Sequence, residues 1–179
     1  MANILLAVTG SISAYKAADI TSQLTKLDHQ VKVLMTPAAT AFITPLTLQV
    51  LSKNPVGLDV MIEEDPQRIE HIDIGKETNI FLVAPASANT IAKLAMGIAD
   101  NMVTSTALAL PQGTKKILAP AMNTKMLEHP ATQRNLKLLQ DYGYQIIQPR
   151  HATLACGDQG SGALATVESI VKAVKEHCL

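Results

Sequence analysis

The segment NILLAVTGS at residues 3–11 decides the fold, because an apolar run at residues 3–8, predicted to be a strand, passes directly into a turn of small polar residues. A strand without polar alternation is expected where both faces of a sheet are buried. Apolar residues then recur at helical spacing, at Ala17, Ile20, Leu24 and Leu27. A strand that leads through a short turn into a helix is the repeating unit of a parallel sheet covered by helices.

The same order of strand, turn and helix recurs along the chain. Apolar runs predict further strands at residues 30–35, 80–83, 116–119 and 144–147. Thr36 and Pro37 are typical of a helix start, a helix is predicted from Pro130 to the terminating Gly143, and the last helix is predicted near residues 167–178. This alternation predicts an α/β fold, a three-layer α/β/α sandwich of flavodoxin-like or Rossmann-like topology. We expect residues 1–179 to form one domain, with an irregular loop at residues 52–68.

Composition excludes several classes of function. Fifteen basic and fifteen acidic side chains balance, which gives no electrostatic reason to expect nucleic-acid or membrane binding and does little to resist self-association. No stretch approaches the roughly 20 apolar residues of a membrane helix, and we see no signal peptide. Two cysteines make no disulfide framework, so a reducing, cytoplasmic setting is expected. The histidines are scattered and no CxxC pair occurs, so no metal site is predicted.

The ends of four predicted strands carry similar short segments. They read TGSIS, MTPAAT, APASANT and APAMNT, at residues 9–13, 35–40, 84–90 and 119–124. Ligands of open α/β sheets bind beyond the carboxyl ends of the strands. Small hydroxyl and amide residues at helix N-termini suit a phosphate and a polar ring edge. These residues alone therefore predict a domain that binds a phosphorylated ligand.

Three longer segments resemble the homo-oligomeric flavin-containing cysteine decarboxylases. APASANTIAKLAMGIADNM at 84–102 is similar to their flavin-contacting segment, PAMNTKM at 120–126 matches their P-x-M-N-x-x-M motif, and LACGDQGSGAL at 154–164 resembles the substrate clamp of their phosphopantothenoylcysteine branch. GSISAYK at 10–16 and EHIDI at 70–74 complete a resemblance that runs along nearly the whole chain. The chain departs from the family at Leu127, where Trp is frequent, and at Ala163-Leu164, where Arg-Met often follows the clamp.

The resemblance implies flavin mononucleotide (FMN) as cofactor. Its implied contacts are Gly10, Ser11, Ile12, Thr36, Phe42, Ser87, Ala88, Asn89, Thr90 and Ala121. Ordinary structural roles stay open for several of them, because Ser11, Thr36 and Ser87 occupy positions typical of helix caps and Phe42 is typical of core packing.

The resemblance also implies catalytic roles for His71, Asn123 and Cys156. His71 would be a base or orienting group at a subunit boundary, and Asn123 would hold the substrate carboxylate. Cys156 would be the acid; it stands in a glycine-rich segment, and a thiol with its ordinary pKa of about 8.5 can donate a proton near neutrality. Substrate contacts are implied for Asn123, Met126, Ala155 and Gly157. Cys178, on the last helix, is interpreted as packing.

The implied activity is FMN-dependent decarboxylation of 4′-phospho-N-pantothenoyl-L-cysteine to 4′-phosphopantetheine in coenzyme A biosynthesis, through a thioaldehyde and an enethiolate. It implies a homotrimer or a dodecamer, and a separate synthetase that makes the substrate, as in the stand-alone form of the enzyme. Two alternatives remain: a peptidyl-cysteine decarboxylase of the same family, and a regulatory flavoprotein without activity. A flavin prenyltransferase fits less well, because His71 and the PAMN segment do not suit it.

Overall fold

A parallel sheet forms the centre of the computed structural model, which describes residues 1–62, 65, 67 and 69–178. Its strand order is β3-β2-β1-β4-β5-β6, and every neighbouring pair is parallel. The strands are β1 (Asn3–Val8), β2 (Gln30–Met35), β3 (Val56–Gly57), β4 (Ile80–Ala86), β5 (Lys115–Pro120) and β6 (Tyr144–Ile146). This order is that of a doubly wound, Rossmann-like sheet.

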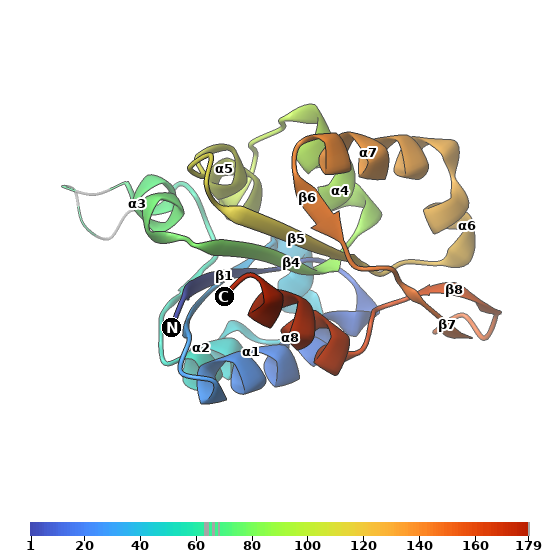
Figure 1. The fold of residues 1–179 in the computed structure, drawn as a ribbon, viewed down its shortest axis with the longest axis horizontal. Coiled ribbons are helices and arrows are strands. Elements are labelled where there is room, and N and C mark those ends of the chain that lie inside the picture. The colour runs from blue at the N-terminus through green and yellow to red at the C-terminus, as the bar shows by residue number, and fades with distance from the viewer. Residues whose placement is uncertain (63–64, 66, 68, 179) are drawn as a thin grey trace.

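Helices cover both faces of the sheet (Figure 1). One layer holds α1 (Ala17–Lys26), α2 (Pro45–Ser52) and α8 (Val167–Glu176), and the other holds α3 (Glu70–Glu77), α4 (Ala88–Met96), α5 (Met102–Leu108) and α7 (Pro130–Asp141). Successive residues of β1 serve opposite layers: Leu6 packs in the core with α1 and α8, and Leu5 packs in the core with α4 and α7. The predicted three-layer α/β/α fold is therefore confirmed.

The predicted elements agree with the structure where apolar patterning is strong. Strands β1 and β2 have the predicted bounds, and β4 and β5 run slightly longer. The prediction that residues 52–68 form an irregular loop is wrong in part, because β3 lies there; residues 63–64, 66 and 68 are outside the described residues. The turn after β2 is a 3-10 helix, η2 (Pro37–Ala41), and Thr36 begins it without a side-chain cap bond. In the part of the chain that the structure describes, no helix has the length and hydrophobicity to cross a membrane.

The glycine-rich segment is half of an antiparallel hairpin, formed by β7 (Arg150–Thr153) and β8 (Gln159–Ala163). It docks on the chain between β5 and α6 (Thr124–Glu128), where the Met122 N–H donates to the Gly162 carbonyl at 3.0 Å. Only glycine allows this approach, because a Cβ on Gly162 would lie 2.1 Å from the Met122 oxygen, and Gly162 has φ +142°. Gly162 thus serves contact with the protein's own backbone.

Candidate active site

The strand order reverses between β1 and β4, and the loops after these two strands meet there. The Thr9 hydroxyl joins them: it donates to the Pro85 carbonyl at 2.6 Å and accepts from the Ser87 N–H at 2.8 Å. Ser11 begins η1 (Ile12–Lys16) and accepts from the Ser13 N–H, as Ser87 begins α4 and accepts from the Thr90 N–H. Because ligands of open α/β sheets bind at such a switch point, a binding site is expected at these loops.

A cavity of about 660 Å³ opens at this switch point. Its lining comes from the segments after β1, β2, β4 and β5 and from the β7–β8 hairpin. The predicted site residues among its lining are Gly10, Ser11, Ile12, Phe42, Ser87, Ala88, Ala121, Asn123, Met126, Ala155 and Cys156. Its volume lies within the range typical of small-molecule sites, roughly 300–1,000 Å³.

The other predicted contacts do not line this cavity. Thr90 is buried, and its hydroxyl lies 3.3 Å from that of Ser87 within the start of α4. Asn89 is exposed on α4, and Gly157 forms the hairpin turn with φ +89°. Thr36 is buried, and its hydroxyl has no hydrogen-bond partner among the described residues. Their ligand contacts stay predictions.

The hairpin brings Cys156 against Asn123. The Asn123 Nδ2 donates to the Cys156 Sγ at 3.3 Å, and the thiol donates to Asp158 Oδ2 at 3.4 Å. Asn123 Oδ1 accepts from the Lys125 N–H at 2.9 Å, so Asn123 also caps α6. An amide nitrogen carries two protons, and therefore one donor of Asn123 remains for a ligand. The site thus offers a proton donor and an amide donor side by side.

Sequence reasoning missed three polar residues here. Asp158, the partner of the thiol, lies only two residues beyond Cys156, and this short separation could have predicted the contact. Lys16 lines the cavity and belongs to the GSISAYK segment. Arg150 also lines it, lies opposite Ala163 in the hairpin register, and donates through Nε to the Leu164 carbonyl at 2.9 Å. No local pattern marks Arg150, because only strand pairing brings it to the cavity.

His71 lies on α3 and is not part of this cavity's lining. Figure 1 shows α3 and the β7–β8 hairpin at opposite ends of the molecule. Within one copy of the chain, His71 therefore does not join Asn123 and Cys156, and its catalytic role stays a prediction that needs a second copy.

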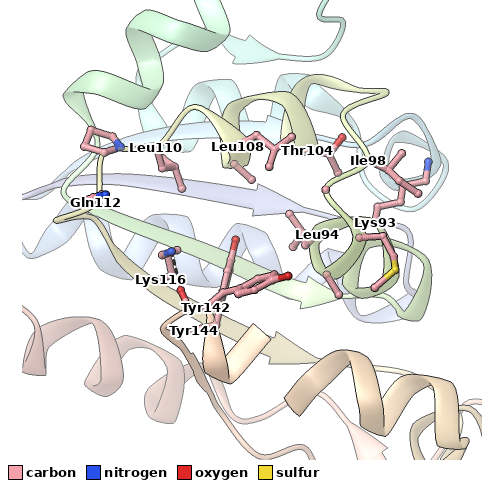
Figure 2. Close-up of a pocket in the computed structure, with 15 residues that line it drawn as sticks. Lys93, Leu94, Ile98, Thr104, Leu108, Leu110, Gln112, Lys116, Tyr142 and Tyr144 are labelled. Carbon is pink, nitrogen blue, oxygen red and sulfur yellow. Dashed lines mark hydrogen bonds between the residues drawn. The ribbon is translucent and has the colours of Figure 1, made fainter. Parts of the chain in front are cut away.

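A second cavity, of about 430 Å³, lies between α4, α5 and the strands β5 and β6 (Figure 2). Lys116 is held there by a bond to the Tyr142 carbonyl at 2.8 Å and lies 5.3 Å from the centre of the Tyr144 ring. Burial raises the pKa of the Tyr144 hydroxyl above its ordinary value, so this group stays neutral. None of the predicted site residues lines this cavity.

Comparison with known proteins defines the class of this chain. The model of the Flavoprotein family matches residues 1–179, and the chain belongs to this family. The chain is 62% identical over 174 residues to a "probable phosphopantothenoylcysteine decarboxylase" of Streptococcus mutans, with 97% of each protein covered. It is 46% identical to the coenzyme A biosynthesis bifunctional protein CoaBC of Bacillus subtilis, over 98% of the chain and 43% of that protein.

Solved structures agree with the sequence comparison. A mutant of PPC decarboxylase complexed with pantothenoylaminoethenethiol superimposes with a TM-score of 0.88 at 30% identity, covering 98% of this chain and 97% of the other. The FMN-binding protein AtHal3 gives a TM-score of 0.84 at 30% identity, with 98% and 95% covered.

Proposed function

We propose that the chain catalyses the FMN-dependent decarboxylation of 4′-phospho-N-pantothenoyl-L-cysteine to 4′-phosphopantetheine in coenzyme A biosynthesis. The observation that carries this proposal is the contact of the Asn123 amide with the Cys156 thiol beside the switch-point cavity. The similarity to the Streptococcus mutans relative, over nearly the full length of both proteins, supports it. The substrate would come from a separate synthetase in the cytoplasm.

The residues at the switch point fit FMN. Gly10, Ser11 and Ser87 line the cavity at two helix starts, where backbone N–H groups favour a phosphate or a polar ring edge. The buried Thr36 hydroxyl has an unused donor and acceptor among the described residues, which suits a polar group of a bound cofactor. Phe42, which is 46% exposed, lines the cavity and offers an apolar face to a ring.

The chemistry of the substrate sets what the protein must do. Direct loss of CO₂ would leave a poor carbanion, whereas oxidation of the substrate thiol to a thioaldehyde makes the carboxylate β to a C=S group. CO₂ then leaves and an enethiolate remains. When bound, FMN supplies this two-electron oxidation and the later return of the electrons. The remaining amide donor of Asn123 holds the carboxylate, and the Cys156 thiol donates the proton that completes 4′-phosphopantetheine.

Self-association would complete the site. We infer a homotrimer, or a dodecamer of trimers, in which α3 of a neighbouring copy brings His71 to the cavity as a base or orienting group. Large apolar side chains are exposed on and near α2 and α3, including Leu46, Val50, Met61 and Ile69, and the net charge is zero. Light scattering tests this inference, and a monomer would contradict it.

A spectrum and a turnover assay test the proposed activity. The purified protein should show flavin absorbance and release CO₂ from phosphopantothenoylcysteine, but not from a peptide with a C-terminal cysteine. Preference for the peptide would instead assign it to peptidyl-cysteine decarboxylation, and a colourless protein that cannot be loaded with FMN would indicate a regulatory role. Cys156→Ser should still release CO₂ but accumulate the oxidised enethiol, and a full yield of 4′-phosphopantetheine would remove Cys156 as the proton donor.

A further inference from the structure

The charge inside the switch-point cavity is one-sided. Lys16, at the end of η1, and Arg150, at the start of β7, are the cationic side chains in its lining, and no acidic side chain lines it among the described residues. Within the same part of the chain, no carboxylate lies within ion-pair distance of either cation. A cavity with unbalanced positive charge attracts anions.

Arg150 is held in place at the base of the hairpin. Its Nε donates to the Leu164 carbonyl at 2.9 Å, which fixes the plane of the guanidinium and leaves the two terminal nitrogens for another acceptor. Such a planar pair of donors matches two oxygens of a phosphate.

The fields of both cations reach one carboxylate outside the cavity. Glu168, in the first turn of α8, has a pKa below its ordinary value because it accepts from its own backbone N–H and from the Thr166 hydroxyl, and because Arg150 and Lys16 lie near. Lys16 and Arg150 therefore both lie near Glu168. Glu168 itself does not line the cavity.

We propose that Arg150, with Lys16 beside it, forms a subsite for a phosphate monoester, and that its ligand is the 4′-phosphate of the substrate. The inference rests on the proposed function and adds the residues that recognise the far end of the substrate. Arg150 begins β7, and Cys156 lies in the turn beyond the end of that strand. A strand of this length spans about 10 Å, so the two residues suit an extended substrate with its cysteine at one end and its phosphate at the other.

Comparison of phosphorylated and dephosphorylated ligands tests the subsite. We would measure kcat and KM of the FMN-loaded wild type and of Arg150→Gln with phosphopantothenoylcysteine and with pantothenoylcysteine. Loss of a charge-assisted bond should lower kcat/KM for the phosphorylated substrate by roughly 10–100-fold, mainly through KM, and should change the dephosphorylated substrate little. Equal losses for both substrates, or no loss, would overturn the proposal.

Two variants separate charge from structure. Arg150→Lys loses the Nε bond to Leu164, as Arg150→Gln does, but keeps the positive charge, and it should retain much of the preference for the phosphorylated substrate. A preference lost equally in both variants would assign Arg150 to hairpin structure alone. Arg134→Gln, on an exposed position of α7 outside the cavity, is the matched control and should leave both substrates unaffected.

FMN also carries a phosphate, and binding measurements show whether Arg150 binds the phosphate of FMN or the 4′-phosphate of the substrate. The dissociation constant of FMN should be the same for the wild type and Arg150→Gln, and a weaker FMN complex would assign the guanidinium to the cofactor instead. Calorimetry with 4′-phosphopantetheine and pantetheine, on the FMN-loaded protein, tests the subsite without turnover. If the wild type turned over neither substrate but bound the phosphorylated ligand more tightly, and Arg150→Gln lacked this preference, the proposed function would fail and the subsite would stand. Equal binding of both ligands to the wild type would overturn the subsite.

Discussion

At the scale of single residues, Cys156 lies between two polar partners that play different roles in hydrogen bonding. Asn123 donates to its sulfur, and Asp158 accepts from its thiol, at 3.3 and 3.4 Å. The hydrogen bond to the carboxylate fixes the direction of the S–H bond, and this direction matters if Cys156 is the acid of the reaction. Asp158 would then act through Cys156, as a positioning residue.

Asp158→Asn keeps the size of the side chain and removes the charge. We expect CO₂ release to stay near the wild-type rate, while the later reduction slows on the order of tenfold, less than the roughly 100-fold or more expected from a general acid itself. The rate of this reduction is measured by stopped-flow after addition of the enethiol, over a range of pH. A parallel loss in both half-reactions, with an unchanged pH profile, would indicate a purely structural role.

Asn123→Asp tests carboxylate capture at the same site. Aspartate is as good a helix cap as asparagine, so α6 should keep its start. The new charge would repel the substrate carboxylate, and we expect KM to rise at least about tenfold. Steady-state kinetics check this, with circular dichroism to show an intact fold. Unchanged turnover would remove Asn123 from the site.

The β7–β8 hairpin is the element that completes the cavity. Its tip carries Cys156, its base carries Arg150, and its inner strand β8 contacts residues 122–124. The docked position depends on Gly160 and Gly162, whose missing side chains leave room for Thr124 and Met122. The hairpin therefore orders the site only as long as these glycines are present.

Gly162→Ala should displace the hairpin. The added methyl group would lie 2.1 Å from the Met122 oxygen, at φ +142°, so the backbone bond between the two residues must break, at a cost of about 1–3 kcal/mol. We expect faster proteolytic cleavage in residues 150–164 and loss of turnover. Gly113→Ala is the control, because a Cβ there meets nothing within 4 Å. Equal cleavage of both variants would show that the hairpin does not depend on this contact.

At the scale of the whole molecule, His29 joins the two ends of the chain. The Ala2 N–H donates to its Nδ1 at 3.2 Å, and the Cys178 sulfur lies 4.0 Å from its Nε2. His29 is 8% exposed, and burial, followed by the positive N-terminus, lowers its pKa below the ordinary value. The folded protein thus favours the neutral ring, whose Nδ1 accepts a bond.

This depressed pKa predicts a loss of stability in acid. Above about pH 6.5, His29 is neutral in both states and its contribution is complete; as the pH falls below that value, the unfolded chain binds the proton first, and the free energy of unfolding decreases by at most about 1.4 kcal/mol per pH unit until the folded pKa is passed. Urea unfolding at several pH values measures it. His29→Gln should flatten this part of the curve, and the exposed His151→Gln should not. Equal slopes for all three proteins would contradict the assignment.

Sequence by itself determined the three layers of the fold and the edge of the sheet at which the switch-point cavity lies. Both follow from short-range patterns: apolar runs such as residues 3–8 and 30–35 form strands, and small polar residues end them. It missed β3, which has only two residues, both strands of the β7–β8 hairpin, and the helices α2, α3 and α5.

Tertiary structure alone decided which side chains share the cavity. Arg150 reaches it because β7 pairs with β8, and Thr9 joins two loops 76 residues apart. It also separated His71 from Asn123 within one copy of the chain. Local periodicity carries no information about such contacts, because they depend on strand register and docking between segments that are distant in the chain.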